Sequence, residues 1–462
     1  MLRIGIALAL LALAASAAEP AGAATIRVRT DAQFQAAVAA LSSSGGTITL
    51  LPGAYADLVV PARGTRPLRI VGRPGARVEH FLLRHTQHVA IGPLKVAPIV
   101  RDAWIDVVGS DHVVLHDLLV TARGTTRSAS LEFPHSEHIT VRHSEFTHCG
   151  DRSLAWSNCI LPRPTSRHVW IVDNWFHDCR GCDFIHGRFA SDLRIIGNRL
   201  ERAIPCKINP TRCGHQDLVE LFAGQGLRVE DNHFGVYAVG GGQVLLAGPV
   251  DHVRIINNVF VGTDPRVPFY QSRVGVGLAG SKRVPHDVRI VNNTILTGAK
   301  RIDGYEGSII LGWRYRELPK RARPLVANNV IGVMATPGPF CERVGRTVAN
   351  VVVRGRGCSP SDHIGPAHLD RRLRPTLRSR LLLDAASARY APPTDMAGYA
   401  RTPVWPPFGA LSIPPLGPVA VRPPSPLPAR APDIGAYEYV AGARLGGDSL
   451  RLEPRWLRHV GS

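Results

Sequence analysis

The fold is decided by a short pattern in the middle of the chain, Leu193-Arg-Ile-Ile-Gly-Asn198-Arg-Leu200. Apolar residues alternate with polar ones, an asparagine follows, and an apolar residue then comes two positions after it. Four closely similar stretches are Val169–Phe176, Leu227–Phe234, Val253–Phe260 and Val288–Ile295. Because alternation with a period of two indicates a β-strand, each copy predicts a strand, a turn and a second strand.

Weaker copies bring the total to ten, with Arg73, Leu94, Leu118, Ser144 and Asn329 at the asparagine position and spacings of 21 to 36 residues. Such short strands are unstable alone, so the copies must stack, and uneven spacing indicates one variable connection per coil. The pattern therefore predicts an all-β, right-handed parallel β-helix of about ten coils, roughly 48 Å tall. We expect a buried amide ladder of structural importance from Asn174, Asn198, Asn232, Asn258, Asn293 and Asn329.

The flanking segments predict how this single domain, residues 25–390, is closed. Thr30–Leu41 has the pattern of an amphipathic helix with Thr30 or Asp31 as its N-cap, and it should cover the first coil. Residues 391–440 are rich in proline, which predicts an extended tail packed on the β-helix. We expect the basic residues 441–462 to be partly disordered.

Composition and the N-terminus narrow the classes of function. Lys and Arg number 55 against 36 Asp and Glu, a net charge of +19, which fits either a solvated cationic surface or a polyanion partner. Residues 1–24 resemble a signal peptide, with Arg3, an apolar run and Ala15-Ser16-Ala17 as a cleavage site. We expect a secreted or periplasmic monomer without a membrane span. No phosphate-binding loop occurs, and export argues against a nucleic-acid partner.

Alignment of the coils on the asparagine exposes a second set of columns. Asp183, Asp217 and Gln243 share one offset, and His186 and Glu220 share another. Since Ile185 and Val219 should point inward, we expect His186 and Glu220 to face outward, with Arg188 and His215 beside them. Stacked carboxylates repel one another, so this face is either a functional site or a polar ladder that caps turns. The preceding loop supplies Lys207 and Arg212.

The eight cysteines can be paired by the same register. Cys149 and Cys179 follow their anchors at equal distances, and Cys159 and Cys182 precede theirs at nearly equal distances, so we expect Cys149–Cys179 and Cys159–Cys182 between adjacent coils. Local bridges Cys206–Cys213 and Cys341–Cys358 complete the set. The rival interpretation is a redox Cys-x-x-Cys at Cys179–Cys182.

Two segments resemble bacterial exported proteins of the pectin-lyase-like β-helix superfamily. They are Gly-Gly-Thr-Ile-Thr-Leu-Leu-Pro-Gly-Ala-Tyr at 45–55, after the helix, and Pro432-Asp-Ile-Gly-Ala-Tyr-Glu438 near the end. The stretch His215-Gln-Asp-Leu-Val-Glu220 also resembles a His-x-Asp-x-Ile-Gln pattern of that group, with Glu220 in place of Gln. The resemblance implies a β-helix whose substrate groove follows the variable loop.

The resemblance further implies a carbohydrate-active protein for acidic, uronate-containing polysaccharides, foremost a lyase. Its catalytic residues would be Lys207, Arg212, His215, Asp217 and Glu220, and its substrate-binding residues Asp183, His186, Arg188 and Gln243. Asp183, Asp217 and Glu220 are candidate Ca²⁺ ligands, and no other cofactor is expected. A glycoside hydrolase on the same fold and a non-catalytic polysaccharide-binding or adhesin scaffold remain as alternatives.

Overall fold

The computed structural model describes residues 24–392 except for 63, 100–102, 123–128, 150–156, 205–215, 236–241, 262–273, 278–282, 296–308, 334–340, 355–356, 370–377, 380, 383–385 and 388. The predicted signal peptide, the tail from residue 393 onward and the predicted Cys206–Cys213 bridge therefore lie outside the described residues. Within the described part, no helix has the length and apolar character needed to cross a bilayer.

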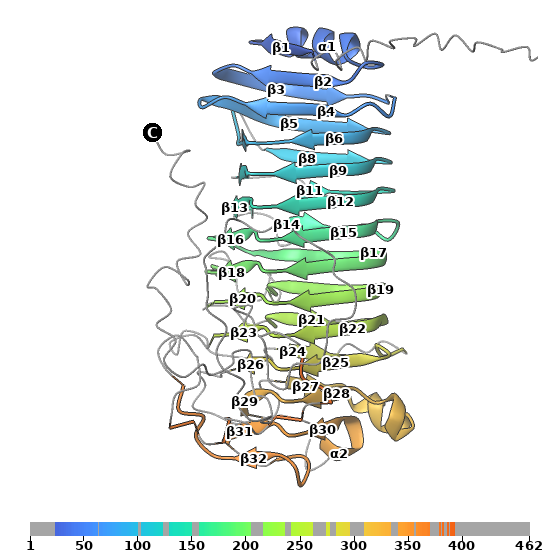
Figure 1. Ribbon diagram of the computed structural model, residues 1–462, viewed down its shortest axis with the longest axis vertical. Coiled ribbons are helices and arrows are strands. Elements are labelled where there is room, and N and C mark those ends of the chain that lie inside the picture. Colours follow the sequence, from blue (N-terminus) through green and yellow to red (C-terminus); the bar gives the residue numbers. More distant parts are fainter. Residues whose placement is uncertain are drawn as a thin grey trace, which may run out of the picture.

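The strands stack coil upon coil along one long axis, each pairing in parallel with its counterparts in the neighbouring coils (Figure 1). They form three rows, called here A, B and C. Row A contains β3 (Gly53–Val60), β5 (Ala76–Arg84), β8 (Trp104–Val108), β11 (Ala129–Glu132), β14 (Ser157–Leu161), the first parts of β17 (Cys182–Ile196) and β19 (Val219–Glu230), β21 (Val244–Leu246), β24 (Val274–Val276) and β27 (Ile309–Leu311).

Rows B and C complete each coil. Row B contains β1 (Thr25–Val28), β2 (Gly46–Leu50), β4 (Leu68–Gly72), β6 (Gln87–Ile91), β9 (Asp111–His116), β12 (Glu137–Arg142), β15 (Arg167–Val172), the second parts of β17 and β19, β22 (Val250–Ile256), β25 (Val288–Val291), β28 (Leu325–Ala327) and β30 (Arg346–Val348). Row C contains β7 (Leu94–Val96), β10 (Leu118–Thr121), β13 (Glu145–Thr147), β16 (Trp175–His177), β18 (Arg199–Glu201), β20 (His233–Phe234), β23 (Val259–Phe260), β26 (Thr294–Ile295), β29 (Val330–Val333), β31 (Val351–Arg354) and β32 (His363–Ile364). The predicted parallel β-helix is confirmed.

The core is a set of inward columns running through the coils. Ile171, Ile195, Val229, Ile255 and Ile290 follow one another in register and are fully buried. Phenylalanines stack in the same way, with ring centroids 4.5 Å apart between Phe234 and Phe260. Each such side chain contributes about 1.5–3 kcal/mol by leaving water, so a coil is stabilised only when its neighbours cover it.

The asparagine column forms the predicted ladder. Asn198 Nδ2 donates to Asn232 Oδ1 at 3.0 Å, and the backbone N–H of Asn198 donates to the same oxygen at 2.9 Å. The same pair of bonds recurs from Asn174 through Asn329. Asn350 and Asp362 extend the ladder beyond the predicted members, because each offers the same acceptor oxygen.

The N-terminal end is closed by α1 (Asp31–Ala40), which lies across the first coil (Figure 1). Thr30 is the N-cap, and its hydroxyl accepts from Gln33 N–H at 3.2 Å. Phe34, Ala37 and Val38 are buried beneath the helix. Three short helices, α2 (Cys341–Val344), η1 (Trp313–Glu317) and η2 (Lys320–Ala322), lie toward the other end.

The predicted disulfides between coils are wrong in their pairing. The structure joins Cys149 to Cys159 and Cys179 to Cys182, with Cα separations of 5.0 and 6.0 Å. Strand β17 pairs with β14 so that Cys182 lies opposite Ser157, two residues away from the expected Cys159. The four sulfurs nevertheless gather in one buried place, with 4.0 Å between Cys159 Sγ and Cys179 Sγ. Cys358 is disulfide-bonded, and the side chain of Cys341 lies outside the described residues.

Candidate functional site

The candidate site lies on row A, where β17 and β19 run side by side. Ile185 pairs with Val219 and His186 with Glu220. Both Ile185 and Val219 are fully buried in the core, so His186 and Glu220 point to the opposite, outer side of the strands, as predicted. They are far less exposed than predicted: the side chain of His186 is 18% exposed and that of Glu220 only 4%.

Three ionisable groups meet there. His186 Nδ1 lies 2.6 Å from Asp183 Oδ2 and 3.1 Å from Glu220 Oε2. Burial by itself lowers the pKa of His186, but the hydrogen bonds and charges of Asp183 and Glu220 outweigh it and raise the pKa to about 10. The imidazole is therefore protonated at neutral pH, and the Asp183–His186–Glu220 cluster is a cation held between two carboxylates.

A glycine bulge bends β17 immediately after the cluster. The pairing with β19 shifts between Gly187 and Arg188. Gly187 has a φ of +142°, and a Cβ there would lie 2.5 Å from the Pro162 carbonyl oxygen, so a larger residue would not fit. The side chain of Arg188 is exposed. It provides a cation within two residues of His186, as the prediction of a substrate-binding role requires.

Asp217 occupies a different place from the one predicted. It is fully buried, its carboxylate accepts from Gly242 N–H, and its own N–H donates to Asp183 Oδ1 at 2.7 Å. These bonds join three successive coils at the start of row A. They match the turn-capping alternative more closely than an outward-facing acid, because the carboxylate is bonded to backbone inside the molecule.

The predicted place of Gln243 on the outer face, in the same column as Asp217, is wrong. Strand β21 pairs with β19 through Val219–Val244, so Gln243 stands one residue away from Asp217's column. Gln243 is fully buried, and its Nε2 donates to the carbonyls of Phe234, Gly235 and Val261 at 3.0–3.3 Å. One extra residue between β21 and β22 displaces the register, because Val219 pairs with Val244 but Gly224 pairs with Val250, and the offset from Asn258 alone does not reveal this.

The residues named as Ca²⁺ ligands do not converge in the structure. Asp183, His186 and Glu220 place their ligand atoms within 4.8 Å of one another, whereas Asp217 turns to Gly242. Calcium prefers six to eight oxygen ligands, and an imidazole nitrogen is not among its usual donors. The described residues alone therefore do not fit a calcium site, and the protonated His186 already supplies positive charge at that position.

Two further results concern residues near the cluster. Lys207, Arg212 and His215 belong to the segment 205–215 and lie outside the described residues, so their roles stay predictions. Sequence reasoning missed Asn158, a buried polar residue that pairs with Asp183 on the preceding strand. It stands 16 residues before its anchor where Asp183 stands 15 before its own, and this difference hid the match.

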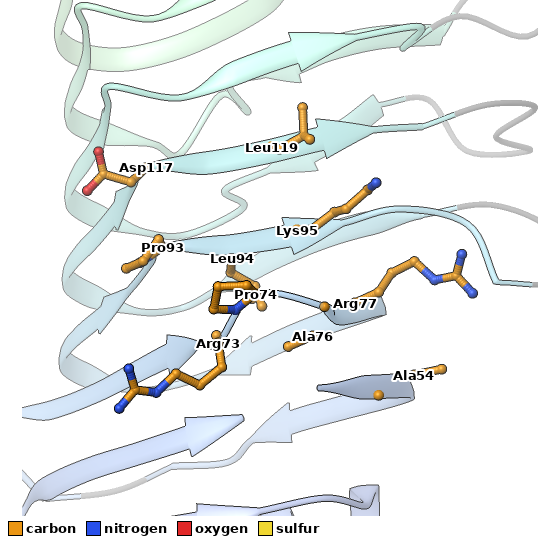
Figure 2. A pocket seen from close by; sticks show the side chains of 13 residues that line it. Ala54, Arg73, Pro74, Ala76, Arg77, Pro93, Leu94, Lys95, Asp117 and Leu119 are labelled. Carbon is orange, nitrogen blue, oxygen red and sulfur yellow. The ribbon is translucent and has the colours of Figure 1, made fainter. Parts of the chain in front are cut away.

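A cavity lies elsewhere, toward the N-terminal end of the β-helix. It has a volume of about 860 Å³ and is lined partly by Arg73, Arg77 and Lys95. Figure 2 shows that Arg73 points away from Arg77 and Lys95, so the three cations do not converge on one ligand. Among the described residues that line it, Asp117 is the one carboxylate. The Asp183–His186–Glu220 cluster is therefore a better candidate for acid–base chemistry than this cavity.

No protein-family model matches the sequence, and no curated protein matches it significantly. Among solved structures, the chain is similar to the alginate lyase AlyGC of the PL6 family, with 15% identity over 71% of this chain and a TM-score of 0.41. The chain covers only 47% of that lyase. It is also similar to the pectate lyase Bsp165PelA from Bacillus sp. N165 (12% identity, 67% of this chain, 82% of that chain, TM-score 0.30). A third similar structure is the Streptococcus pneumoniae surface adhesin PfbA (9% identity, 73% of this chain, 86% of that chain, TM-score 0.34).

Proposed function

We propose that this chain is an exported, monomeric enzyme that binds an acidic polysaccharide on row A and cleaves it by β-elimination. The observation that carries the proposal is the buried cluster of Asp183, His186 and Glu220. A desolvated cation held between two carboxylates is costly to build for stability alone, and perturbed ionisable groups gather at functional sites.

The charges of the cluster define what else the site needs. Two carboxylates and one imidazolium leave one negative charge, so a uronate carboxylate requires further cations. Arg188 supplies one on the same strand, and we assign Lys207 and Arg212 of the preceding loop to the same task. His186, held protonated by its two partners, neutralises only part of their charge, so these further cations must stabilise the carbanion that develops next to the substrate carboxylate.

The chemical step needs a base and a proton donor. In β-elimination a base takes the proton from C5 of the uronate, the C5–H electrons form the C4=C5 double bond, and the C4–O bond breaks. The leaving oxygen then takes a proton. We assign the base to His215, whose imidazole has an ordinary pKa near neutrality, or to Lys207 in its unprotonated form, in which case Arg188 and Arg212 carry the positive charge. Glu220 orients His186 and does not face the substrate directly, because its side chain is almost fully covered.

Calcium stays a proposal for the complete site. Asp183 and Glu220 offer two carboxylates, and the substrate's own carboxylate would add oxygens. Binding of the ion there requires His186 to release its proton or to turn away. Calcium affinity should therefore rise with pH if this cluster is the ligand set, which calorimetric titration at pH 6 and pH 9 measures.

A glycoside hydrolase is the second candidate. The ligand oxygens of Asp183 and Glu220 lie within 4.8 Å of each other, close to the separation of about 5 Å between the carboxyl groups of retaining glycosidases. The near-complete burial of Glu220 favours the lyase, because a nucleophile must reach the sugar.

One assay separates these functions. The purified protein is incubated with alginate and polygalacturonate, two polyuronides built from different sugars. A rise in ultraviolet absorbance from an unsaturated product supports the lyase. New reducing ends without absorbance indicate a hydrolase, and retention on the polymer without any product indicates a binding scaffold.

A further inference from the structure

A groove lies on row B, outside the candidate site. Its floor is an outward column in which Arg69, Ala90, Val114, Thr140, Trp170 and Arg194 follow one another in register on six strands. Five strand spacings of about 4.8 Å make this column roughly 24 Å long. The cavity along it has a volume of about 720 Å³ and includes all six residues in its lining.

One edge of the groove is a row of stacked histidines. The rings of His88, His112, His138 and His168 follow one another with centroid distances of 4.9, 4.5 and 4.7 Å. All four residues have a left-handed backbone with φ near +50°. That conformation favours His, Asp, Asn and Gly at this turn, and the same turn holds Asp192 and Gly226 in later coils. Backbone geometry thus accounts for a histidine at each turn, but not for four in a row with exposed or half-exposed rings.

Carboxylates are interleaved with these rings. Asp111 accepts from His138 Nδ1 at 2.8 Å and from His112 Nδ1 at 2.9 Å, and Asp192 lies 3.1 Å from His168 Nδ1. The edge therefore presents hydrogen-bond donors and acceptors in alternation along the axis of the β-helix.

The two ends of the groove are cationic, and one of them is aromatic. Trp170 is 40% exposed, and the guanidinium carbon of Arg194 lies 4.5 Å from the centre of its ring. Arg194 Nε also donates to Asp192 at 2.8 Å, which fixes the guanidinium in place. At the opposite end Arg69 is exposed on β4.

We infer that this groove is a second binding surface that holds a stretch of uronate-containing polysaccharide along the axis of the β-helix. The flat face of Trp170 takes the apolar face of a sugar ring, and Arg69 and Arg194 take uronate carboxylates. The histidines and Asp111 bind hydroxyl groups, which both donate and accept hydrogen bonds. The choice of an acidic sugar rests on the proposed function, whereas the existence of a sugar groove rests on row B alone.

Two other ligands fit the groove less well. A metal ion at Asp111, His112 and His138 requires two imidazole lone pairs to converge, but these rings are stacked with only 26° between their planes. A DNA backbone offers phosphate oxygens that only accept hydrogen bonds, so Asp111 and Asp192 would find no donor on it, whereas the hydroxyl groups of a sugar supply donors. Strand β17 carries both sites, since His186 lies in its row A part and Arg194 in its row B part.

The test uses the double variant Trp170→Ala/Arg69→Ala of the full chain, with Trp313→Ala/Arg321→Ala as the matched control. Trp313 and Arg321 are an exposed tryptophan and an exposed arginine on η1 and η2, away from the groove. Affinity gel electrophoresis measures retention by alginate, polygalacturonate, a neutral glucan and double-stranded DNA. Thermal melting confirms that each variant is folded.

We expect the double variant to lose at least about tenfold in affinity for one of the polyuronides, whereas the control variant binds as the wild type does. Unchanged retention of the folded double variant, or an equal loss toward DNA or toward the neutral glucan, overturns the inference. The same proteins are assayed for unsaturated product. If the double variant loses retention and the wild type makes no product, the groove is supported and the lyase is contradicted. If the wild type makes product and the double variant is retained as before, the lyase is supported and the groove is contradicted.

Discussion

The Nδ1 atom of His186 lies 3.1 Å from a carboxylate oxygen of Glu220, the residue paired with it on the next strand of row A. This relationship between adjacent coils, together with Asp183 at 2.6 Å, fixes a positive charge in a nearly covered position. It also makes the charge state of the site depend on one proton.

The first prediction concerns stability and pH. The pKa of His186 is raised from 6.5 to about 10 in the folded chain, so its contribution to stability is fully present below pH 6.5 and is lost as the pH rises toward 10. His186→Gln should therefore lower the melting temperature most at pH 6, and the difference from wild type should shrink steadily up to pH 10. Melting curves at several pH values measure this. If the difference in melting temperature between the variant and the wild type does not vary with pH, the proton on His186 contributes nothing to stability.

The second prediction concerns the amide ladder. Asn232 joins two coils and also donates from Nδ2 to the carbonyl of Ile195 at 2.8 Å. Asn232→Ala leaves buried groups without partners and should cost about 1–3 kcal/mol of unfolding free energy. Denaturant unfolding measures the loss. Arg228→Ala, which changes an exposed residue outside the ladder in the same coil, serves as the control. Wild-type stability in Asn232→Ala would contradict the structural role of the ladder.

The third prediction separates the two roles considered for Asp217. Because its carboxylate bonds to Gly242 N–H inside the β-helix, Asp217→Asn should keep most of the stability, since an amide oxygen still accepts that bond. Asp217→Ala removes the acceptor and should cost about 1–3 kcal/mol. Calorimetry compares the two variants. Equal stability of Asp217→Ala and wild type, combined with lost turnover in Asp217→Asn, would restore the catalytic assignment.

The fourth prediction concerns the cysteines. Arg152, Arg167 and Arg180 place Cys149, Cys159, Cys179 and Cys182 on four different tryptic peptides. Mass spectrometry of the unreduced digest should find Cys149 linked to Cys159 and Cys179 linked to Cys182. Peptides linked through Cys149–Cys179 would instead support bridges between coils.

The fold is predictable from the sequence because each coil repeats the same physical solution. Alternation around Ile195 and Val229 reveals the strands, and Asn198 or Asn232 marks the turn that every coil needs. These signals add along the chain, so that weak copies around Leu118 or Ser144 can still be placed. The capping helix follows from Thr30 and the glycines after it.

The candidate site is less predictable because it depends on the turn whose length varies. The pairing of His186 with Glu220 follows from equal offsets, but one residue more or less in a turn moved Gln243 out of its expected column and Cys182 away from Cys159. The sequence also does not reveal burial: the alternation places Glu220 on the outer side of its strand, but its side chain is nevertheless covered. The histidine row escaped detection because His88 and His168 sit in left-handed turns, where the strand alternation gives no signal.

The central claim is that row A converts a uronate polymer to an unsaturated product. The most direct measurement follows ultraviolet absorbance while the wild type, Arg188→Ala, Lys207→Ala and the control Arg84→Ala, an exposed arginine on β5, act on alginate and polygalacturonate. The account predicts a rise in absorbance with the wild type and the control, and a loss of about a hundredfold or more in Arg188→Ala and in Lys207→Ala. A folded wild type that yields no unsaturated product from either polymer, or Arg188→Ala and Lys207→Ala variants as active as the control, would contradict it.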